Sequence, residues 1–199
     1  MTRVVLATRN PGKVEELRRI LTGVELVGLE AYPDMPEVEE TGATFAENAL
    51  LKARAVAEHT GLPAVADDSG LCVDFLGGAP GIRSARWAGE PSDDRRNLDL
   101  VLDQLADAGD GLRGAHFFCA AALVVPRVGE RVVEGRVDGT LRRAPRGTNG
   151  FGYDPIFVPL GESRTTAEMP SEEKDAISHR GKAFRALAPV LMALLKTGS

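Results

Sequence analysis

The chain has 199 residues, of which 43% are hydrophobic and 27% charged, and its formal net charge is −5. This composition is typical of a globular protein and excludes collagen-like, disordered and membrane-embedded chains. The negative charge argues against general electrostatic binding to a nucleic-acid backbone. We therefore expect no nucleic-acid partner, and we expect any phosphate group to be held by local contacts.

The cysteine content and the start of the chain indicate the compartment. Cys72 and Cys119 are far apart and form no Cys-x-x-Cys motif, which is typical of a reducing compartment and argues against a zinc site. We expect both to be small buried side chains. Met1 leads directly into a strand-like segment, and no apolar run approaches the roughly 20 residues of a membrane span. These features predict a cytoplasmic protein with no signal peptide and no membrane partner.

The hydrophobic periodicity predicts strands and helices in alternation. Strands are expected at 4–7, 64–66, 71–73, 117–125, 131–141 and 155–158. Helices are expected after a turn at 10–12, from a capping box at Thr44 to Gly61, from near Ser92 to a stop at 109–111, and from a cap at Ser171 toward the C-terminus. Gly181 and Pro189 should weaken or bend the last helix. Because no repeat or linker interrupts the pattern, it predicts one α/β domain over 1–199 with a mixed sheet.

The loop Thr8–Lys13 connects the first strand to the first helix and is the first candidate for chemistry. Backbone N–H groups at a helix N-terminus bind anions, and the proline and glycine of this loop allow close approach. It is not a Walker loop, because Ala7 replaces the required glycine and Val14 replaces the Ser or Thr. The alternative is a simple turn with a solvated lysine. Lys13 lies in the first helical turn, where the helix dipole disfavours a cation, so an anionic ligand would explain its position.

Two adjacent acids, Asp67 and Asp68, follow the third apolar run, with Glu39 and Glu40 upstream. Carboxylates at the end of a strand suit Mg²⁺, which binds a few carboxylates and several waters. Adjacent strand residues face opposite ways, so we expect one aspartate to hold metal while the other supports the backbone. The alternative is turn chemistry, since Asp, Ser and Gly are all common in turns.

Two further segments combine polar groups with aromatic rings or positive charge. In the glycine-rich loop at 146–154, Phe151 and Tyr153 could stack on a base and Asp154 could accept hydrogen bonds from a base or sugar. The alternative is a loop whose aromatic residues fill the core. The segment 171–182 gathers basic groups that suit a phosphate or a purine carbonyl. The alternative to a binding role for this segment is a solvated helix surface, because His179 lies off the apolar stripe of the predicted helix.

Six segments in chain order resemble the inosine triphosphate pyrophosphatase family, also called Ham1-like, whose members act on noncanonical purine nucleotides. These segments read TRNPGK, EETGATFAENALLKA, ADDSGLCVD, GGAPGIRSARWAG, FGYDPIF and SEEKDAISHRGKA. The resemblance spans nearly the whole chain. It implies an elongated, two-lobed α/β fold and a homodimer that hydrolyses dITP, ITP and XTP with Mg²⁺. The products would be the monophosphate and pyrophosphate, and the reaction would cleanse the nucleotide pool.

The resemblance also implies roles for individual residues. The triphosphate is expected on Thr8, Arg9, Asn10, Pro11, Gly12 and Lys13. Asp68 matches the proton acceptor and Ser69 a substrate contact, while Glu40 matches a metal ligand beside Asp68, with Glu39 as a one-residue ambiguity. Lys52 is expected to reach the phosphates. The purine is expected to contact Phe151, Gly152, Tyr153, Asp154, Lys174, His179 and Arg180.

Some questions stay open at the level of the sequence. Arg9 departs from the family pattern, in which many members have a small residue, and this could alter phosphate affinity. Selection of the base is expected to rest on the purine 6-carbonyl, since donors aimed at it would oppose the amino group of adenine. Two other functions remain as alternatives: a Maf-like nucleotide pyrophosphatase with another base preference, and a nucleotide sensor without turnover.

Overall fold

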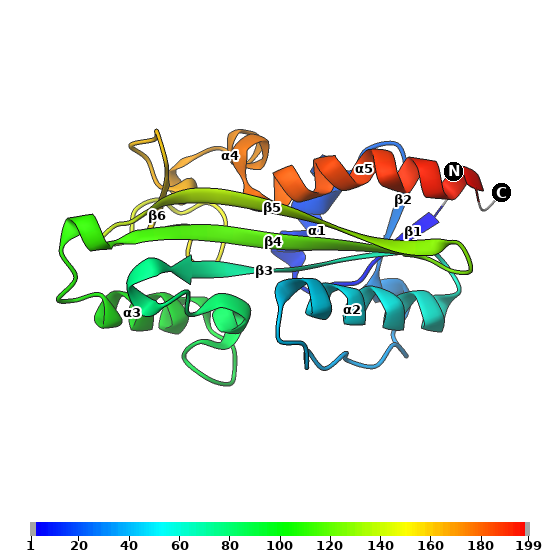
Figure 1. The fold of residues 1–199 in the computed structure, drawn as a ribbon, viewed down its shortest axis with the longest axis horizontal. Helices are drawn as coiled ribbons and strands as arrows, with labels where there is room; N and C mark the ends of the chain where they lie inside the picture. The colour runs from blue at the N-terminus through cyan, green and yellow to red at the C-terminus, as the bar shows by residue number, and fades with distance from the viewer. Residues whose placement is uncertain (1–2, 198–199) are drawn as a thin grey trace. The chain divides into compact units, whose positions relative to one another are not determined.

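The computed structural model describes residues 3–197, so the first two and last two residues of the expected domain 1–199 lie outside the described residues. Its strands are β1 (Arg3–Leu6), β2 (Glu25–Gly28), β3 (Ala64–Val73), β4 (Gly114–Val125), β5 (Gly129–Leu141) and β6 (Phe157–Pro159). Its α-helices are α1 (Pro11–Ile20), α2 (Phe45–Thr60), α3 (Asp94–Gln104), α4 (Ser171–Ile177) and α5 (His179–Thr197). The strands form one sheet in the order β2-β1-β3-β4-β5-β6, with helices beside it (Figure 1).

The sheet is mixed, as the sequence predicts. β1 pairs in parallel with both β2 and β3, so that Leu6 lies opposite Gly28 on one side and Val65 on the other. β5 and β6 pair antiparallel. β4 and β5 are neighbours joined by the short turn 126–128, and a connection this short joins antiparallel strands because parallel ones need a long crossover. The α/β class with a mixed sheet is therefore confirmed.

The chain divides into two compact units. Unit 1 consists of residues 3–68, 119–135 and 180–197, and unit 2 consists of residues 69–118 and 136–179. In unit 1, side chains of β1, β3 and β4 pack against α1 and α5, with Leu6, Leu17 and Phe184 among the buried residues. In unit 2, α3 packs with strand and loop residues such as Phe117 and Phe157. The expectation of one domain stays a prediction.

Local signals at α2 agree with the sequence. Thr44 is the N-cap, and its hydroxyl accepts a hydrogen bond from the Glu47 N–H at 3.2 Å. Gly61 ends the helix with φ at 69°, a left-handed conformation that glycine adopts without steric cost. α2 lies on the opposite face of the unit 1 sheet from α5 (Figure 1). These caps fix the helix that carries two of the polar side chains described below.

The expected strand end at Asp67 is wrong. β3 runs without a break from Ala64 to Val73, so the two predicted short strands are one strand that contains both aspartates. The polar string resembles a turn because aspartate, serine and glycine favour turns. It stays extended because other elements supply partners for the buried carboxylates, and the turn alternative is thereby excluded.

Several other boundaries also differ from the prediction. α3 is capped by Asp93 and ends at Gln104, before the glycines at 109–111. The predicted last helix is two helices, since Ser178 is extended, with φ −66° and ψ 156°. Serine competes with helical hydrogen bonding, whereas Gly181 and Pro189 are accommodated inside α5.

The ends of two short elements differ as well. Ser171 is the first residue of α4 and makes no capping hydrogen bond. β6 begins at Phe157 rather than at Pro155. β2 was not predicted, because its four residues include only two large apolar side chains.

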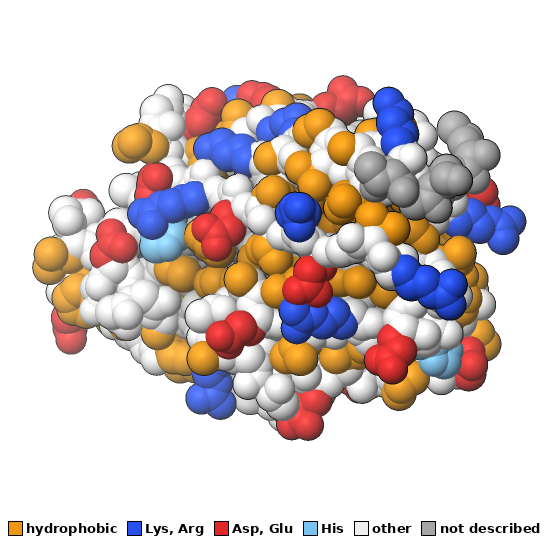
Figure 2. All heavy atoms as spheres, turned by 45° about the vertical axis from the view of Figure 1, so that its right-hand side comes forward, with side chains coloured by type: hydrophobic (Ala, Val, Ile, Leu, Met, Phe, Trp, Pro, Cys, Tyr) orange, Lys and Arg blue, Asp and Glu red, His pale blue; other side chains and the backbone are white. Residues whose placement is uncertain are grey.

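The cysteines lie inside the protein, and charged side chains lie on its surface. Both thiols are buried, as expected. Among the described helices, none combines the length and the apolar character needed to cross a bilayer. Figure 2 shows acidic and basic side chains scattered among one another, with hydrophobic side chains between them, over one face of the molecule.

Candidate active site

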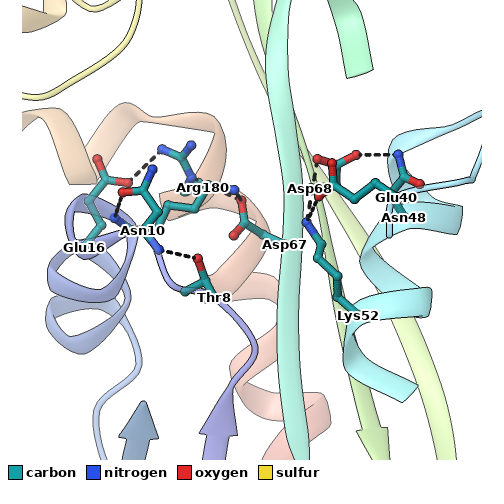
Figure 3. Close-up of polar contacts among 10 residues, drawn as sticks. Thr8, Asn10, Glu16, Glu40, Asn48, Lys52, Asp67, Asp68 and Arg180 are labelled. Carbon is teal, nitrogen blue, oxygen red and sulfur yellow. Dashed lines mark hydrogen bonds and ion pairs between the residues drawn. The ribbon is translucent and has the colours of Figure 1, made fainter. Parts of the chain in front are cut away.

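Asp67 and Asp68 are the centre of the polar site in unit 1. They are neighbours on β3, and their side chains point to opposite faces of the strand, as the alternation of strand residues predicts (Figure 3). Both are buried, with 1% and 5% of their surface exposed, respectively. Buried carboxylates require partners, and each of the two has a different set.

Asp67 belongs to a chain of alternating charges. Its Oδ2 lies 2.9 Å from the Lys13 ammonium and accepts a hydrogen bond from Arg180 Nε at 3.2 Å. Arg180 in turn donates from Nη1 to Glu16 at 2.9 Å. Burial alone would raise the pKa of Asp67, but the charges of Lys13, Arg180 and Lys52 outweigh it and hold that pKa well below its usual range. Asp67 is therefore a permanent anion at neutral pH.

The loop Thr8–Lys13 is built as a helix N-terminus. Asn10 is the N-cap of α1, and its side-chain oxygen accepts the Lys13 N–H at 3.2 Å. The Thr8 hydroxyl accepts the Asn10 N–H at 3.2 Å (Figure 3). Gly12 lies in the same first turn, where N–H groups have no partner inside the helix. The position of Lys13 in this turn is confirmed, and the anion beside it in this structure is Asp67.

Arg9 is exposed, but its guanidinium is fixed. It donates from Nη2 to the carbonyl of Met35 at 2.6 Å. Met35 is itself 3% exposed, so Arg9 connects the loop Thr8–Lys13 to the segment before α2. The departure from a small residue thus adds a cation to this loop without disturbing the cap at Asn10.

Asp68 faces α2 and has a different set of partners. Its Oδ2 accepts a hydrogen bond from the Asn48 amide at 3.1 Å, and its Oδ1 lies 3.8 Å from the Lys52 ammonium. Burial raises the pKa of Asp68, the charge of Glu40 adds to this, and Lys52 opposes it, so that the pKa is about 6. A carboxyl with a pKa near neutrality can take up a proton and release it again.

Asn48 is a site residue that the sequence analysis missed. It is 1% exposed, and its Oδ1 accepts the Gly42 N–H at 2.8 Å while its amide donates to Asp68. It therefore holds Asp68 in place against the loop before α2. The available signal was its spacing, because Asn48 and Lys52 are four residues apart and so share one face of α2.

Glu40, rather than Glu39, is the acid beside Asp68. The Glu40 carboxylate lies 2.6 Å from the same Lys52 ammonium that approaches Asp68, whereas Glu39 is exposed. Residues 3–197 contain no group of three or more potential metal-binding side chains. Two converging carboxylates nevertheless fit Mg²⁺, which usually binds one or two carboxylates and completes its shell with water and phosphate oxygens.

Unit 2 carries the glycine-rich loop, which Asp154 holds in shape. Asp154 is buried, and its carboxylate accepts hydrogen bonds from the Phe151 N–H at 3.0 Å, the Thr166 hydroxyl at 2.8 Å and the Lys174 ammonium at 2.6 Å. The Lys174 ammonium also lies 5.2 Å from the centre of the half-buried Phe151 ring. Phe151 and Lys174 thus place an aromatic face beside a cation.

The other residues of this loop differ in their surroundings. The Tyr153 ring packs in the core and its hydroxyl donates to the Ser84 carbonyl at 2.7 Å, as in the alternative of a loop whose aromatic residues fill the core, and its contact with a base stays a prediction. The backbone N–H of Gly152 donates to Asp94 at 2.9 Å. Ser69 is half-buried on β3, directly after Asp68. The roles assigned to Ser69 and Gly152 stay predictions.

The basic segment is not the solvated surface that was the alternative. His179 is buried and stacks on Phe117, with ring centroids 4.7 Å apart. Arg180 is also buried, and its guanidinium is held by Asp67 and Glu16. In this structure the Arg180 side chain supports the acid in β3, and its expected contact with a purine stays a prediction. A base contact by His179 stays a prediction.

We expect Gly150→Ala to damage the glycine-rich loop. Gly150 has φ +73°, and an added Cβ would lie 2.1 Å from Asp154 Oδ2. The variant should lose about 2 kcal/mol or more of unfolding free energy, because left-handed strain adds to the displacement of a bonded carboxylate. Urea unfolding measures this, with Gly152→Ala as the control, since that position shares the positive φ but has open space. Equal losses in the two variants would contradict the steric account.

Known proteins resemble this chain over nearly its whole length. The sequence profile described as the Ham1 family matches residues 4–190. A dITP/XTP pyrophosphatase of Streptomyces avermitilis is 67% identical over 199 residues, which are 98% of this chain and 100% of that protein. The dITP/XTP pyrophosphatase of Streptomyces coelicolor is 68% identical over the same extent of both chains.

Solved structures show the same similarity. A HAM1 protein from Coxiella burnetii has a TM-score of 0.86 and 43% identity, covering 97% of this chain and 100% of its own. The nucleoside-triphosphatase or dITP/XTP pyrophosphatase of Mycobacterium abscessus has a TM-score of 0.76 and 57% identity, covering 94% and 100%. The fold and the sequence therefore both match proteins of the Ham1 family.

Proposed function

The chain belongs to the Ham1 family, and from this premise we propose that it hydrolyses deaminated purine nucleoside triphosphates, namely dITP, ITP and XTP, to the monophosphate and pyrophosphate. Relatives that are 67% and 68% identical over their full lengths carry the name dITP/XTP pyrophosphatase. The observation that carries the proposal is the buried Asp68, which lies beside Lys52 and has a pKa of about 6.

The phosphates bind where α1 begins. The first-turn N–H groups of α1 and the Lys13 ammonium offer donors and positive charge to the triphosphate. Lys13 would move its ammonium from Asp67 toward the phosphate, since the carboxylate and the phosphate are competing anions for the same cation. The charge that develops on the leaving pyrophosphate is stabilised by these groups.

Asp68 is the proton acceptor for the attacking water. Asn48 fixes the position of its carboxylate, and Lys52 keeps positive charge close to it. Glu40 and Asp68 are the residues that would hold Mg²⁺, which would supply positive charge to the phosphate oxygens. No covalent intermediate is required for this reaction, because the water attacks the phosphorus directly.

The purine is bound by the glycine-rich loop of unit 2. The half-buried Phe151 ring can stack on a base. The Lys174 ammonium beside it can donate a hydrogen bond to the 6-carbonyl of a purine. Adenine presents an amino group at that position, so the donor and the amino group would both lose partners. This supports a preference for deaminated purines over ATP. We further propose a homodimer in the cytoplasm, in line with the sequence resemblance.

An assay of products tests this function. We expect purified protein with Mg²⁺ to release inorganic pyrophosphate and the monophosphate from ITP, dITP and XTP at least about 10-fold faster than from ATP. Chromatography of the products separates this from release of orthophosphate and a diphosphate, which would contradict the proposal. Preference for another base would favour the Maf-like alternative, and tight binding without pyrophosphate release would favour the sensor.

A further inference from the structure

A second candidate binding site lies within unit 2. It is a hollow of about 550 Å³, a size within the range of roughly 300–1,000 Å³ for small-molecule sites. The charged residues that line it are Arg113, Arg142, Arg143, Arg146, Asp110 and Glu162. Among these residues, Arg146 is the first residue of the glycine-rich loop at 146–154, and the other five lie outside the candidate active site. Four guanidinium groups in one hollow are unexpected in a chain whose net charge is −5.

The acids of the hollow do not balance its arginines. Asp110 forms an ion pair with Arg143 at 2.8 Å, and Glu162 lies 3.4 Å from Arg164, which is not part of the lining. In the described part of the chain, no carboxylate lies within ion-pair distance of the other three arginines. The hollow therefore has an excess of positive charge, and like charges held together cost free energy unless an anion joins them.

Arg113 shows how firmly one of these charges is held. It is 3% exposed, and its guanidinium donates to the carbonyls of Leu141 at 2.8 Å, Leu105 at 2.9 Å and Arg142 at 3.0 Å. Carbonyls satisfy hydrogen bonds but carry no net charge. Burial lowers the pKa of Arg113, the charge of Arg143 lowers it further, and the charge of Asp110 opposes both. The fold thus fixes a buried cation whose hydrogen bonds go to neutral carbonyls, with Asp110 as an acid that acts on it only from beyond ion-pair distance.

Donors remain available in the hollow. A guanidinium has five N–H groups. Arg142 donates one side-chain bond, to the Ser163 carbonyl at 3.2 Å, and the Arg146 side chain makes no hydrogen bond to any residue in 3–197. Arginine forks match the paired oxygens of a phosphate group and bind them bidentately. The chemistry of the lining therefore suits a phosphate anion better than a neutral ligand.

We propose that this hollow is an anion site for a compact phosphate ligand with two or more negative charges, such as inorganic pyrophosphate or the polyphosphate tail of a nucleotide. Arg142 and Arg146 provide the direct donors, while Arg113 supplies fixed positive charge from below the surface. Apart from Arg146 at the start of the glycine-rich loop, the lining shares no residue with the proposed reaction, so its occupation is a property additional to hydrolysis.

The test is isothermal titration of the full chain in the presence of a chelator, with inorganic pyrophosphate as the probe. Arg146→Glu is the main variant, because this side chain makes no hydrogen bond to a residue in 3–197 and interacts with Glu168 only through its charge, so its replacement should leave the fold intact. We expect pyrophosphate affinity at one site to fall at least about 10-fold in this variant, and wild-type binding to weaken with added salt. Arg142→Ala should act in the same direction.

The control is Arg136→Ala, which removes an exposed arginine of β5 that pairs with Asp138 outside the hollow. It should leave pyrophosphate binding unchanged. The kcat/KM for ITP should stay within about twofold in Arg142→Ala and Arg136→Ala, which lie outside the glycine-rich loop, so failure of this site is distinguishable from failure of the proposed function. Equal pyrophosphate affinity and stoichiometry in wild type and Arg146→Glu would overturn the proposal.

Further titrations distinguish the sources of the phosphate. If the polyphosphate tail is the ligand, α,β-methylene ATP should bind the hollow at least as tightly as pyrophosphate does, and Arg146→Glu should remove that binding. If free pyrophosphate is the ligand, the nucleotide should bind more weakly. Citrate tests the phosphate itself, because a citrate affinity equal to that of pyrophosphate would overturn the selectivity that the arginine forks imply.

Discussion

Replacement of Asp68 by asparagine should lower kcat at least about 100-fold while leaving nucleotide binding in place. Asparagine keeps the size and shape of the side chain but can neither accept the proton nor offer negative charge to a metal. Asn48 can still donate to the new side-chain oxygen, so the local geometry is retained. The loss should therefore appear in kcat rather than in KM. Turnover close to that of the wild type would remove Asp68 from the mechanism.

The same substitution should stabilise the protein in the absence of metal. Folding raises the pKa of Asp68 to about 6, against roughly 3.9 for an unfolded aspartate. The folded state therefore binds this proton more tightly, and the contribution of Asp68 to stability falls as pH rises from about 4 to about 6 and stays low above that range. Removing the charge should raise the free energy of unfolding at pH 7.5 by about 1 to 3 kcal/mol.

Urea unfolding at two pH values measures this effect. With a chelator present, the gain of Asp68→Asn over wild type should be full at pH 7.5 and nearly absent close to pH 4. Asp99→Asn is the control, since Asp99 is a partly exposed surface partner of Arg95 and its removal should change stability by less than about 0.5 kcal/mol. A destabilised Asp68→Asn at pH 7.5 would show that the interactions of the carboxylate outweigh its burial.

Local pattern predicted those parts of the fold that local physics decides. The cap at Thr44 and the stop at Gly61 depend on residues close in sequence. The loop Thr8–Lys13 is also decided locally, because Asn10 caps α1 through a hydrogen bond to Lys13, only three residues along the chain. The carboxylate chemistry of Asp67 and Asp68 predicts a metal or catalytic site, although the sequence pattern wrongly ends the strand before them.

The sequence does not predict which charged side chains are buried and paired in the folded protein. Arg180 reads as a solvated helix residue, yet its partners Asp67 and Glu16 lie 113 and 164 residues away in sequence. His179 likewise stacks on a phenylalanine of another element. Such pairs depend on how the chain returns to the same sheet, which no local period records. The same reason explains why Tyr153 fills the core of unit 2 rather than lining an open loop.

Asp67→Asn should destabilise the protein by about 3 to 5 kcal/mol, the opposite sign from its neighbour, because breaking a buried ion pair leaves an uncompensated charge. Asp67 and Glu16 balance Lys13 and Arg180, and all four side chains are at most 15% exposed. Asparagine leaves this cluster with a net positive charge. The pKa of Asp67 is depressed, so its stabilising contribution is complete above about pH 4 and is lost as pH falls below that value.

Urea unfolding at pH 7.5 should show this loss in Asp67→Asn and not in Asp99→Asn. The double variant Lys13→Met with Asp67→Asn separates charge imbalance from lost hydrogen bonds, since it leaves Arg180 paired with Glu16 and restores neutrality. It should recover at least about 1 kcal/mol relative to Asp67→Asn, as expected for residues that interact directly. A double variant no more stable than the single one would mean that the geometry around Asp67, rather than its charge, holds this part of unit 1 together.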